Sequence, residues 1–215
     1  MTMPSKNDIL GCILAGGLSR RMGGGDKALL ELGGAPMLTR VIRRLEPQVS
    51  ALVLNANGDA DRFAVYGLPV IADTVGDFAG PLAGVLAGMR HALAMDEPIS
   101  HVATAASDTP FFPLDLVERF AEMATTPDTI VLATSGGNRH PVFGLWPVAL
   151  ADDLEAWLKE SDTFKVLAWV HRHRLAAVDF DLVRHGEQSF DPFFNANTPD
   201  DMIEAENFLR EQQIS

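Results

Sequence analysis

The sequence predicts a three-layer α/β/α fold in which helices cover both faces of a mostly parallel central sheet. Two observations favour this class: strand-like apolar runs alternate with segments of helical periodicity, and polar residues cluster where the apolar runs end. Alternation of this kind requires right-handed crossovers between parallel strands. With 215 residues, 47% of them hydrophobic, the chain can bury a substantial core, and we expect a single domain.

The predicted strands are short apolar runs bounded by turn-forming residues. They cover residues 9–14, 51–54, 68–72, 101–106, 129–133, 142–146 and 175–180. The predicted helices carry apolar residues at helical spacing and cover residues 36–45, 81–95, 114–124, 148–159 and 199–212. Pro36 suits the first turn of the first helix, and Pro47 lies beyond its end.

The composition argues against several classes of protein. A formal net charge of −12 disfavours general nucleic-acid binding, which needs a basic face against the phosphate backbone. The apolar runs are far shorter than the roughly 20 residues that span a bilayer, and residues 1–8 lack the apolar core of a signal peptide. Cys12, the only cysteine, lies within the first apolar run, where we expect a buried core residue. We therefore expect a cytoplasmic protein with no membrane partner.

A glycine-rich, cationic loop follows the first predicted strand, and residues 14–27 read LAGGLSRRMGGGDK. Glycines let backbone N–H groups approach a ligand, while Arg20, Arg21 and Lys27 can neutralise phosphate oxygens. A solvated, flexible loop is the alternative interpretation. Because an acidic chain concentrates three cations here, we favour a site for a compact polyphosphate.

Two common phosphate-binding motifs do not fit this loop. Lys27 is preceded by Asp26 and followed by Ala28, so the Gly-Lys-Ser/Thr end of a Walker A motif is missing. Gly23, Gly25 and Ala28 match G-x-G-x-x-A, but that match starts too far beyond the strand for a dinucleotide fingerprint. The loop therefore predicts neither a P-loop hydrolase nor a dinucleotide site.

Polar residues follow three further predicted strands at the point where each strand ends. They are Asn55, Asp73 and the pair Ser107-Asp108. Each has a local explanation, such as a turn, a helix cap or an Asx-turn. Because ligands of open α/β sheets gather at the carboxyl ends of the strands, coincidence at four strand ends indicates a binding site.

Asp108 is the strongest metal candidate, because one carboxylate opposite a phosphate loop can hold Mg²⁺ while substrate phosphates complete its coordination. The histidines are scattered, so zinc is not expected, and the pair His171 and His173 is interpreted as solvated surface.

The sequence also lacks the G-x-S-x-G and H-E-x-x-H motifs of hydrolases. Nucleotidyl transfer is consistent with this absence, since an anionic phosphate nucleophile needs alignment and cations but no general base.

Together these segments resemble the molybdenum cofactor guanylyltransferases, which have a Rossmann-like nucleotidyltransferase fold. The resemblance rests on residues 14–27, Asn55, Asp73 with residues 80–84, residues 108–110, and the motif Asn195-Ala196-Asn197-Thr198-Pro199. It implies one nucleotidyltransferase domain over residues 1–215, with a nucleotide-binding part at about 8–110 and a molybdopterin-binding part at about 111–212.

The resemblance also implies residue roles. The implied GTP-binding residues are Leu14, Ala15, Gly16, Gly17, Lys27, Asn55, Asp73 and Asp108. The implied catalytic residues are Arg21, Lys27 and Asp108, and Asp108 would also bind Mg²⁺. Asn195 and Asn197 would bind molybdopterin, while Thr198 and Pro199 independently predict the start of a helix.

The implied reaction transfers GMP from GTP to the terminal phosphate of molybdopterin or Mo-molybdopterin, and releases pyrophosphate. The resemblance further implies transient contact with proteins that insert molybdenum or mature molybdoenzymes. A cytidylyltransferase or another nucleotidyltransferase is the nearest alternative, and a non-catalytic nucleotide-binding or cofactor-binding protein is a more distant one.

Two further features of the sequence have no assigned role. Gly80, Gly84 and Gly88 indicate either close helix packing or ligand contact. His140 resembles a family feature near the second substrate.

Overall fold

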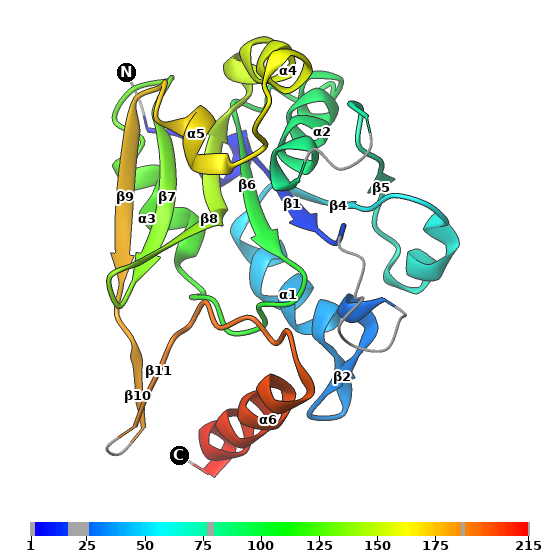
Figure 1. The fold of residues 1–215 in the computed structure, drawn as a ribbon, viewed down its shortest axis with the longest axis vertical. Coiled ribbons are helices and arrows are strands. Elements are labelled where there is room, and N and C mark those ends of the chain that lie inside the picture. The colour runs from blue at the N-terminus through cyan, green and yellow to red at the C-terminus, as the bar shows by residue number, and fades with distance from the viewer. Residues whose placement is uncertain (1–2, 17–25, 77–79, 186–187, 215) are drawn as a thin grey trace.

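A twisted sheet forms the centre of the molecule (Figure 1). The computed structural model describes residues 3–16, 26–76, 80–185 and 188–214, and within these residues seven strands pair in the order β5-β4-β1-β6-β8-β7-β9. Their bounds are β1 (Ile9–Leu14), β4 (Ala51–Asn55), β5 (Val70–Ile71), β6 (His101–Ala106), β7 (Ile130–Ser135), β8 (Asn138–Pro147) and β9 (Leu175–Phe180). All neighbouring pairs are parallel except those of β8, which runs antiparallel to both β6 and β7.

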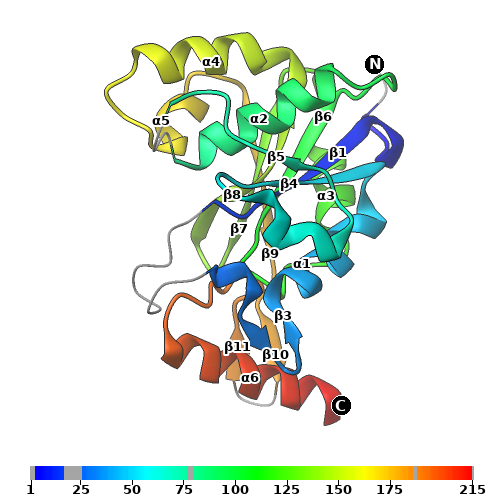
Figure 2. The ribbon, with the colours of Figure 1, turned by 90° about the vertical axis from the view of Figure 1, so that its right-hand side faces the viewer.

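Helices cover both faces of this sheet, as the edge-on view in Figure 2 shows. One face carries α1 (Met37–Leu45) and α3 (Leu116–Met123), and the other carries α2 (Pro81–Leu93), α4 (Ala151–Glu160) and α5 (Val166–Val170). Each face has its own buried apolar cluster. Short 3-10 helices cover Lys6–Asp8, Lys27–Leu29, Glu46–Gln48, Ala60–Tyr66 and Val148–Leu150. The predicted three-layer fold with a mostly parallel sheet is therefore confirmed.

A third apolar cluster lies beyond the carboxyl edge of the sheet. It fastens the last helix, α6 (Pro199–Ile214), to the short hairpin β2 (Glu31–Leu32) and β3 (Ala35–Pro36), and to the hairpin β10 (Val183–His185) and β11 (Gln188–Phe190). The Phe190 and Phe208 rings stack with centroids 3.8 Å apart, and both meet Phe111 edge-on. Figure 2 places α6 below the sheet, and its contacts with the hairpin are made to β2. The C-terminal helix is thus held against elements from early in the chain.

Strand β8 differs most from the strand predicted there, since it starts at Asn138 rather than at residue 142. Gly136 and Gly137 have φ of 53° and 80°, the left-handed conformation that both central residues of a tight hairpin turn require. This turn reverses the chain without a helix, which explains why β8 is antiparallel. The structure also adds α5 and the two short hairpins, none of which was predicted.

Helix α2 packs closely against the sheet where two of its glycines face it. A Cβ on Gly88 would lie 3.2 Å from Cys12 Sγ, and a Cβ on Gly84 would lie 2.8 Å from Leu14 Cδ2 and fall on Asn55 Oδ1. Close packing therefore accounts for both glycines. Cys12 is fully buried, as predicted, and burial raises the pKa of its thiol to about 12.

Two smaller outcomes concern the surface. The prediction of a solvated His173 is wrong, because its Nε2 lies 3.0 Å from Asp153 Oδ2 and its ring packs against Trp169. This carboxylate gathers donors from α5 and the turn after it, including Trp169 Nε1 at 2.8 Å. None of the helices in the described part of the chain is long and apolar enough to cross a bilayer.

Candidate active site

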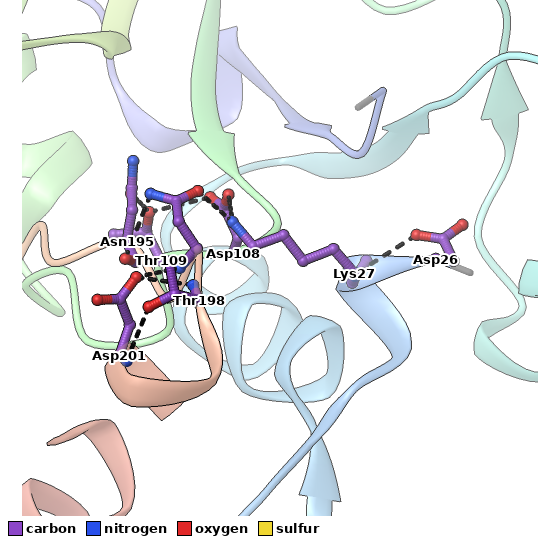
Figure 3. Close-up of polar contacts among 9 residues, drawn as sticks. Asp26, Lys27, Asp108, Thr109, Asn195, Thr198 and Asp201 are labelled. Atoms are coloured by element: carbon purple, nitrogen blue, oxygen red, sulfur yellow. Dashed lines mark hydrogen bonds and ion pairs between the residues drawn. The ribbon is translucent and has the colours of Figure 1, made fainter. Parts of the chain in front are cut away.

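The centre of the site is the side chain of Lys27, which joins two distant parts of the chain (Figure 3). Its Nζ lies 2.6 Å from Asp108 Oδ2 and also donates to Asn197 Oδ1. The Lys27 and Asp108 side chains are only 14% and 22% exposed, so water screens their charges incompletely. A carboxylate and an amide oxygen therefore converge on one cation.

Lys27 owes its position to the residue before it. Asp26 caps the 3-10 helix Lys27–Leu29, because its side chain accepts a hydrogen bond from the Ala28 backbone N–H at 3.3 Å. The other oxygen of Asp26 accepts a hydrogen bond from Arg62 Nε at 2.8 Å. The same Asp26 that rules out a Walker A motif thus orients the lysine, a role that sequence reasoning missed.

Asp108 lies in the turn after β6, where it also holds the C-terminal segment. The Ala196 N–H donates to the Asp108 carbonyl at 3.1 Å, and Thr109 Oγ1 donates to Asn195 Oδ1. Ala196 is fully buried, whereas Asn195 and Asn197 on either side of it are exposed. Ala196 therefore anchors the segment in the core, while the asparagines on either side of it stay accessible to solvent.

The start of α6 fixes Asn197 from the other side. Asp201 N–H donates to Thr198 Oγ1 at 3.2 Å, and Asp201 Oδ2 accepts from the Thr198 N–H at 2.8 Å. This reciprocal pair is a capping box, and it confirms the helix start predicted at Thr198 and Pro199. Asp201 Oδ2 accepts a further hydrogen bond from the Asn197 N–H at 2.7 Å. The cap, whose Thr198 and Asp201 are labelled in Figure 3, therefore also holds the backbone of Asn197.

A second polar cluster lies at the ends of β4 and β5. Buried Asn55 donates through Nδ2 to Asp73 Oδ1 at 2.9 Å and to the Ile71 carbonyl at 3.2 Å. Asn57 donates to the other oxygen of Asp73 at 2.7 Å, and its own Oδ1 accepts from the Asp73 N–H at 2.9 Å. Asp73 is thus oriented by two asparagines, of which the sequence singled out only Asn55.

The strand register explains why these side chains share one edge. Leu14 at the end of β1 pairs with Asn55 of β4 on one side and with Ala106 of β6 on the other. Beyond this row, the Ala15 N–H donates to the Asn55 carbonyl at 2.9 Å, and the Ser107 N–H donates to the Leu14 carbonyl at 3.1 Å. Strands β1, β4 and β6 therefore end at the same edge of the sheet, as predicted from the sequence.

The first residues of the glycine-rich loop continue from this row. Gly16 is exposed and has no positive φ, and a Cβ on it would meet no described protein atom within 4 Å. Neither backbone conformation nor packing against the described residues requires glycine there, which leaves its backbone accessible to a ligand. Gly17, Arg20 and Arg21 lie outside the described residues, and so does the rest of the loop up to Gly25.

The donor atoms of the site are hard oxygens. Across the described part of the chain, no three His, Cys, Asp or Glu side chains cluster as a protein-only metal cage would require. Asp108 Oδ2 and Asn197 Oδ1 nevertheless already share one cation, the Lys27 ammonium. Carboxylate and amide oxygens suit Mg²⁺, which keeps waters and substrate phosphates in its shell. The donor set therefore fits a metal that is held mainly by its substrate.

Comparison with known proteins identifies the family. Residues 11–176 match the MobA-like NTP transferase domain. The chain belongs to this family. A relative of this MobA-like protein from Mesorhizobium japonicum is 49% identical over 95% of this chain and 98% of its own, and one from Rhizobium meliloti is 50% identical over 92% and 90%. Both relatives are named molybdenum cofactor guanylyltransferase.

Solved structures support the fold of this MobA-like protein. Molybdopterin-guanine dinucleotide biosynthesis protein A from Archaeoglobus fulgidus superposes with a TM-score of 0.70, covering 94% of this chain and 99% of its own at 21% identity. At that identity the likeness concerns the fold. The fold expected from the sequence resemblance is therefore shared with a known structure.

Proposed function

We propose that this protein transfers GMP from GTP to the terminal phosphate of molybdopterin. A terminal phosphate oxygen of the acceptor attacks the α-phosphorus of GTP, the bond from the α-phosphorus to the α,β-bridging oxygen breaks, and pyrophosphate leaves. The products are molybdopterin guanine dinucleotide and pyrophosphate. The observation that carries the proposal is the contact of Lys27 with both Asp108 and Asn197, which joins the nucleotide side to the C-terminal segment.

We assign the donor side to the ends of β1, β4, β5 and β6. GTP would bind at Leu14, Ala15, Gly16, Gly17, Lys27, Asn55, Asp73 and Asp108. The exposed backbone of Gly16 suits close approach of the nucleotide, and the fixed carboxylate of Asp73 suits a hydrogen bond to a nucleoside hydroxyl or amine. Lys27 and Arg21 would neutralise the phosphates and the leaving pyrophosphate.

Asp108 would hold Mg²⁺ together with phosphate oxygens of GTP. When bound, the metal would add positive charge where negative charge develops on the transferred and leaving phosphates. The residues of the chain would supply alignment: the Asp26 cap fixes Lys27, and the Asp108 carbonyl fixes Ala196. No general base is required, because the acceptor phosphate is already an anion at neutral pH.

We assign the acceptor side to Asn195 and Asn197, whose exposed amides can donate to phosphate or pterin oxygens.

In this proposal residues 1–215 form one nucleotidyltransferase domain, with a nucleotide-binding part at about 8–110 and a molybdopterin-binding part at about 111–212. The reaction takes place in the cytoplasm, and the acceptor is exchanged with molybdenum-insertion and molybdoenzyme-maturation proteins.

A turnover assay with competing nucleotides tests the proposal. The protein is incubated with molybdopterin, Mg²⁺ and either GTP or CTP, and both pyrophosphate and the dinucleotide product are measured. Preferential turnover of GTP is expected. A clear preference for CTP would assign a cytidylyltransferase instead, and GTP binding without pyrophosphate release would assign a non-catalytic binding protein.

A further inference from the structure

Residues 191–197 connect β11 to α6 and carry both asparagines of the acceptor side. Figure 1 shows this stretch passing below the carboxyl ends of the strands before α6 begins. One end is held by Asp108 and Thr109, as described above. The other end is held at Asp191, which lies against Ser135 of β7 and His140 of β8, and we call these three residues the anchor cluster.

The anchor cluster is a continuous set of short contacts. Ser135 Oγ lies 2.7 Å from Asp191 Oδ1 and 2.6 Å from His140 Nε2. The second oxygen of Asp191 lies 3.7 Å from the same imidazole nitrogen. Asp191 Oδ1 also accepts a hydrogen bond from the Phe193 N–H at 2.8 Å. Asp191 therefore ties its own segment to both strands of the β7–β8 hairpin.

The direction of each hydrogen bond follows from the groups present. Asp191 is an acceptor, so the Ser135 hydroxyl donates its proton to the carboxylate. Ser135 Oγ then accepts from the Nε2–H of His140. Because the single Ser135 proton goes to Asp191, the hydrogen bonds assign a proton to His140 Nε2. Burial lowers the pKa of His140 despite the nearby Asp191 charge, which favours the neutral imidazole. Each of the three side chains in the anchor cluster thus has a defined role as hydrogen-bond donor or acceptor.

Aromatic packing extends the anchor from Asp191 to Phe193. The His140 and Phe193 rings stack with centroids 4.6 Å apart and planes 20° apart. Phe193 also meets Phe143 and Phe180 at 4.9 and 5.3 Å. Phe193 is buried and lies two residues before Asn195. Its position in the segment is thereby fixed by stacking as well as by the hydrogen bond of its backbone.

The cluster is not a nucleophilic triad, although it contains Ser, His and Asp. In a triad the carboxylate orients the imidazole from Nδ1 and leaves the serine facing substrate. Here Asp191 and Ser135 both lie on the Nε2 side, and Ser135 donates directly to the carboxylate. Ser135 is also fully buried. The geometry excludes attack by this hydroxyl and leaves a structural or positioning role.

We infer that the anchor cluster positions Asn195 and Asn197 for binding the acceptor phosphate or pterin, an inference that rests on the proposed function. Physical contacts connect it to the site: Asp191 holds Phe193, and Thr109 and Asp108 hold the next residues, Asn195 and Ala196. Asn197 then meets Lys27. Release of the Asp191 end lets the segment shift by fractions of an ångström, which misplaces the two amides, whereas Lys27 keeps its contact with Asp108.

Steady-state kinetics with both substrates varied tests the inference. Ser135→Ala and Asp191→Ala each break the anchor, and the KM for the acceptor is expected to rise about tenfold while the KM for GTP stays within about twofold. Thr134→Val is the matched control, because the hydroxyl of this β7 neighbour donates to Asp179 Oδ1 at 2.8 Å and not to the anchor. It should leave both KM values unchanged.

Rescue variants separate positioning from general loss of packing. His140→Gln keeps a side-chain N–H donor for Ser135, whereas His140→Phe keeps an aromatic ring on Phe193 and removes the donor. Asp191→Asn retains an acceptor oxygen. His140→Gln and Asp191→Asn are therefore expected to have a KM for the acceptor close to that of the wild-type protein. Equal increases in both KM values, or no difference from Thr134→Val, would overturn the inference.

A spectroscopic readout makes the test independent of turnover. In ¹⁵N-labelled protein without substrates, Ser135→Ala is expected to shift or broaden the backbone amide signals of Ala196 and Asn197, and to leave those of Asn55 and Asp73 in place. Unchanged signals at Ala196 and Asn197 would also overturn the inference. If the wild-type protein transfers no GMP, the proposed function fails, while this measurement still reports whether the anchor controls the segment.

Discussion

Lys27 Nζ and Asp108 Oδ2 lie 2.6 Å apart although 81 residues separate them in the chain. The lysine comes from the end of the glycine-rich loop and the aspartate from the turn after β6, so the pair links two segments that follow neighbouring strands. Because both side chains are mostly shielded, removal of either leaves the other charge poorly compensated. The site therefore depends on a matched pair rather than on two independent charges.

Replacement of this aspartate gives the first prediction. Asp108→Ala is expected to lower the rate of pyrophosphate release by at least about 100-fold, because it removes the proposed metal ligand and the partner of Lys27. The protein should stay folded by circular dichroism. Asp115→Ala is the control, since that exposed side chain makes no cap hydrogen bond to α3. Turnover of Asp108→Ala close to that of the control would contradict the metal assignment.

The second prediction concerns the acceptor side. Asn197→Ala removes an exposed amide whose oxygen accepts from Lys27 and whose nitrogen donates to the Asn195 carbonyl at 3.4 Å, and which the acceptor would contact in our proposal. We expect a rise of about tenfold in the KM for molybdopterin, with GTP affinity retained in a titration calorimeter. Asn207→Ala, an exposed position on α6, serves as the matched loss of an amide. An equal loss of affinity for GTP and for molybdopterin would contradict the assignment of Asn197 to the acceptor side.

Two glycines of one helix give the third prediction. A Cβ on Gly84 falls on Asn55 Oδ1, so Gly84→Ala is expected to displace Asn55 from Asp73 and weaken GTP binding about tenfold or more. Gly88→Ala instead meets Cys12 and Val102 at 3.2 and 3.2 Å, and should alter stability by about 1–3 kcal/mol without affecting GTP affinity. Equal GTP affinities of the two variants would refute the role of Asn55 at the nucleotide side.

The fourth prediction concerns acid stability. His101 is 4% exposed, and within the described residues its Nε2 has no hydrogen-bond partner. Burial lowers the pKa of His101 to about 4 from an ordinary 6.5. Between these two values the unfolded chain binds the proton and the folded protein does not, so the free energy of unfolding falls as the pH is lowered. The full contribution is present above pH 6.5.

Urea denaturation at several pH values measures this contribution. A loss of about 3 kcal/mol is expected between pH 6.5 and pH 4 from this residue. His101→Gln should flatten the profile across that window, and the exposed variant His171→Gln should keep it. Identical slopes for wild type and His101→Gln would show that the imidazole titrates alike in both states.

The sequence predicted the arrangement of the strand-end residues better than that of the C-terminal segment, and the sheet explains why. Parallel strands bring their carboxyl ends to one edge, so Leu14, Asn55 and Asp108 could be placed together from strand ends alone. Local capping signals likewise predicted the helix start at Thr198. Such patterns act over a few residues or follow from a fixed strand register, and both can be recognised in one sequence.

The contact of Lys27 with Asn197 spans 170 residues and follows no such rule. It depends on how the aromatic cluster of Phe111, Phe190 and Phe208 docks α6, and on how Asp191 meets the β7–β8 hairpin. These are tertiary packing choices, and many arrangements would satisfy the same apolar pattern. The sequence could name Asn197 by resemblance, but only the structure shows its lysine partner.

The docking of α6 on β2 and β3 has a mechanical consequence. Leu32 lies five residues after Lys27 and shares its buried cluster with Phe208, so the last helix of the chain braces the segment that follows the lysine. Detachment of α6, beginning at its C-terminal end, would weaken the support of both Lys27 and Asn197 at the same time. The two sides that we propose for nucleotide and acceptor would then separate together, although Lys27 and Asn197 lie 170 residues apart in the sequence.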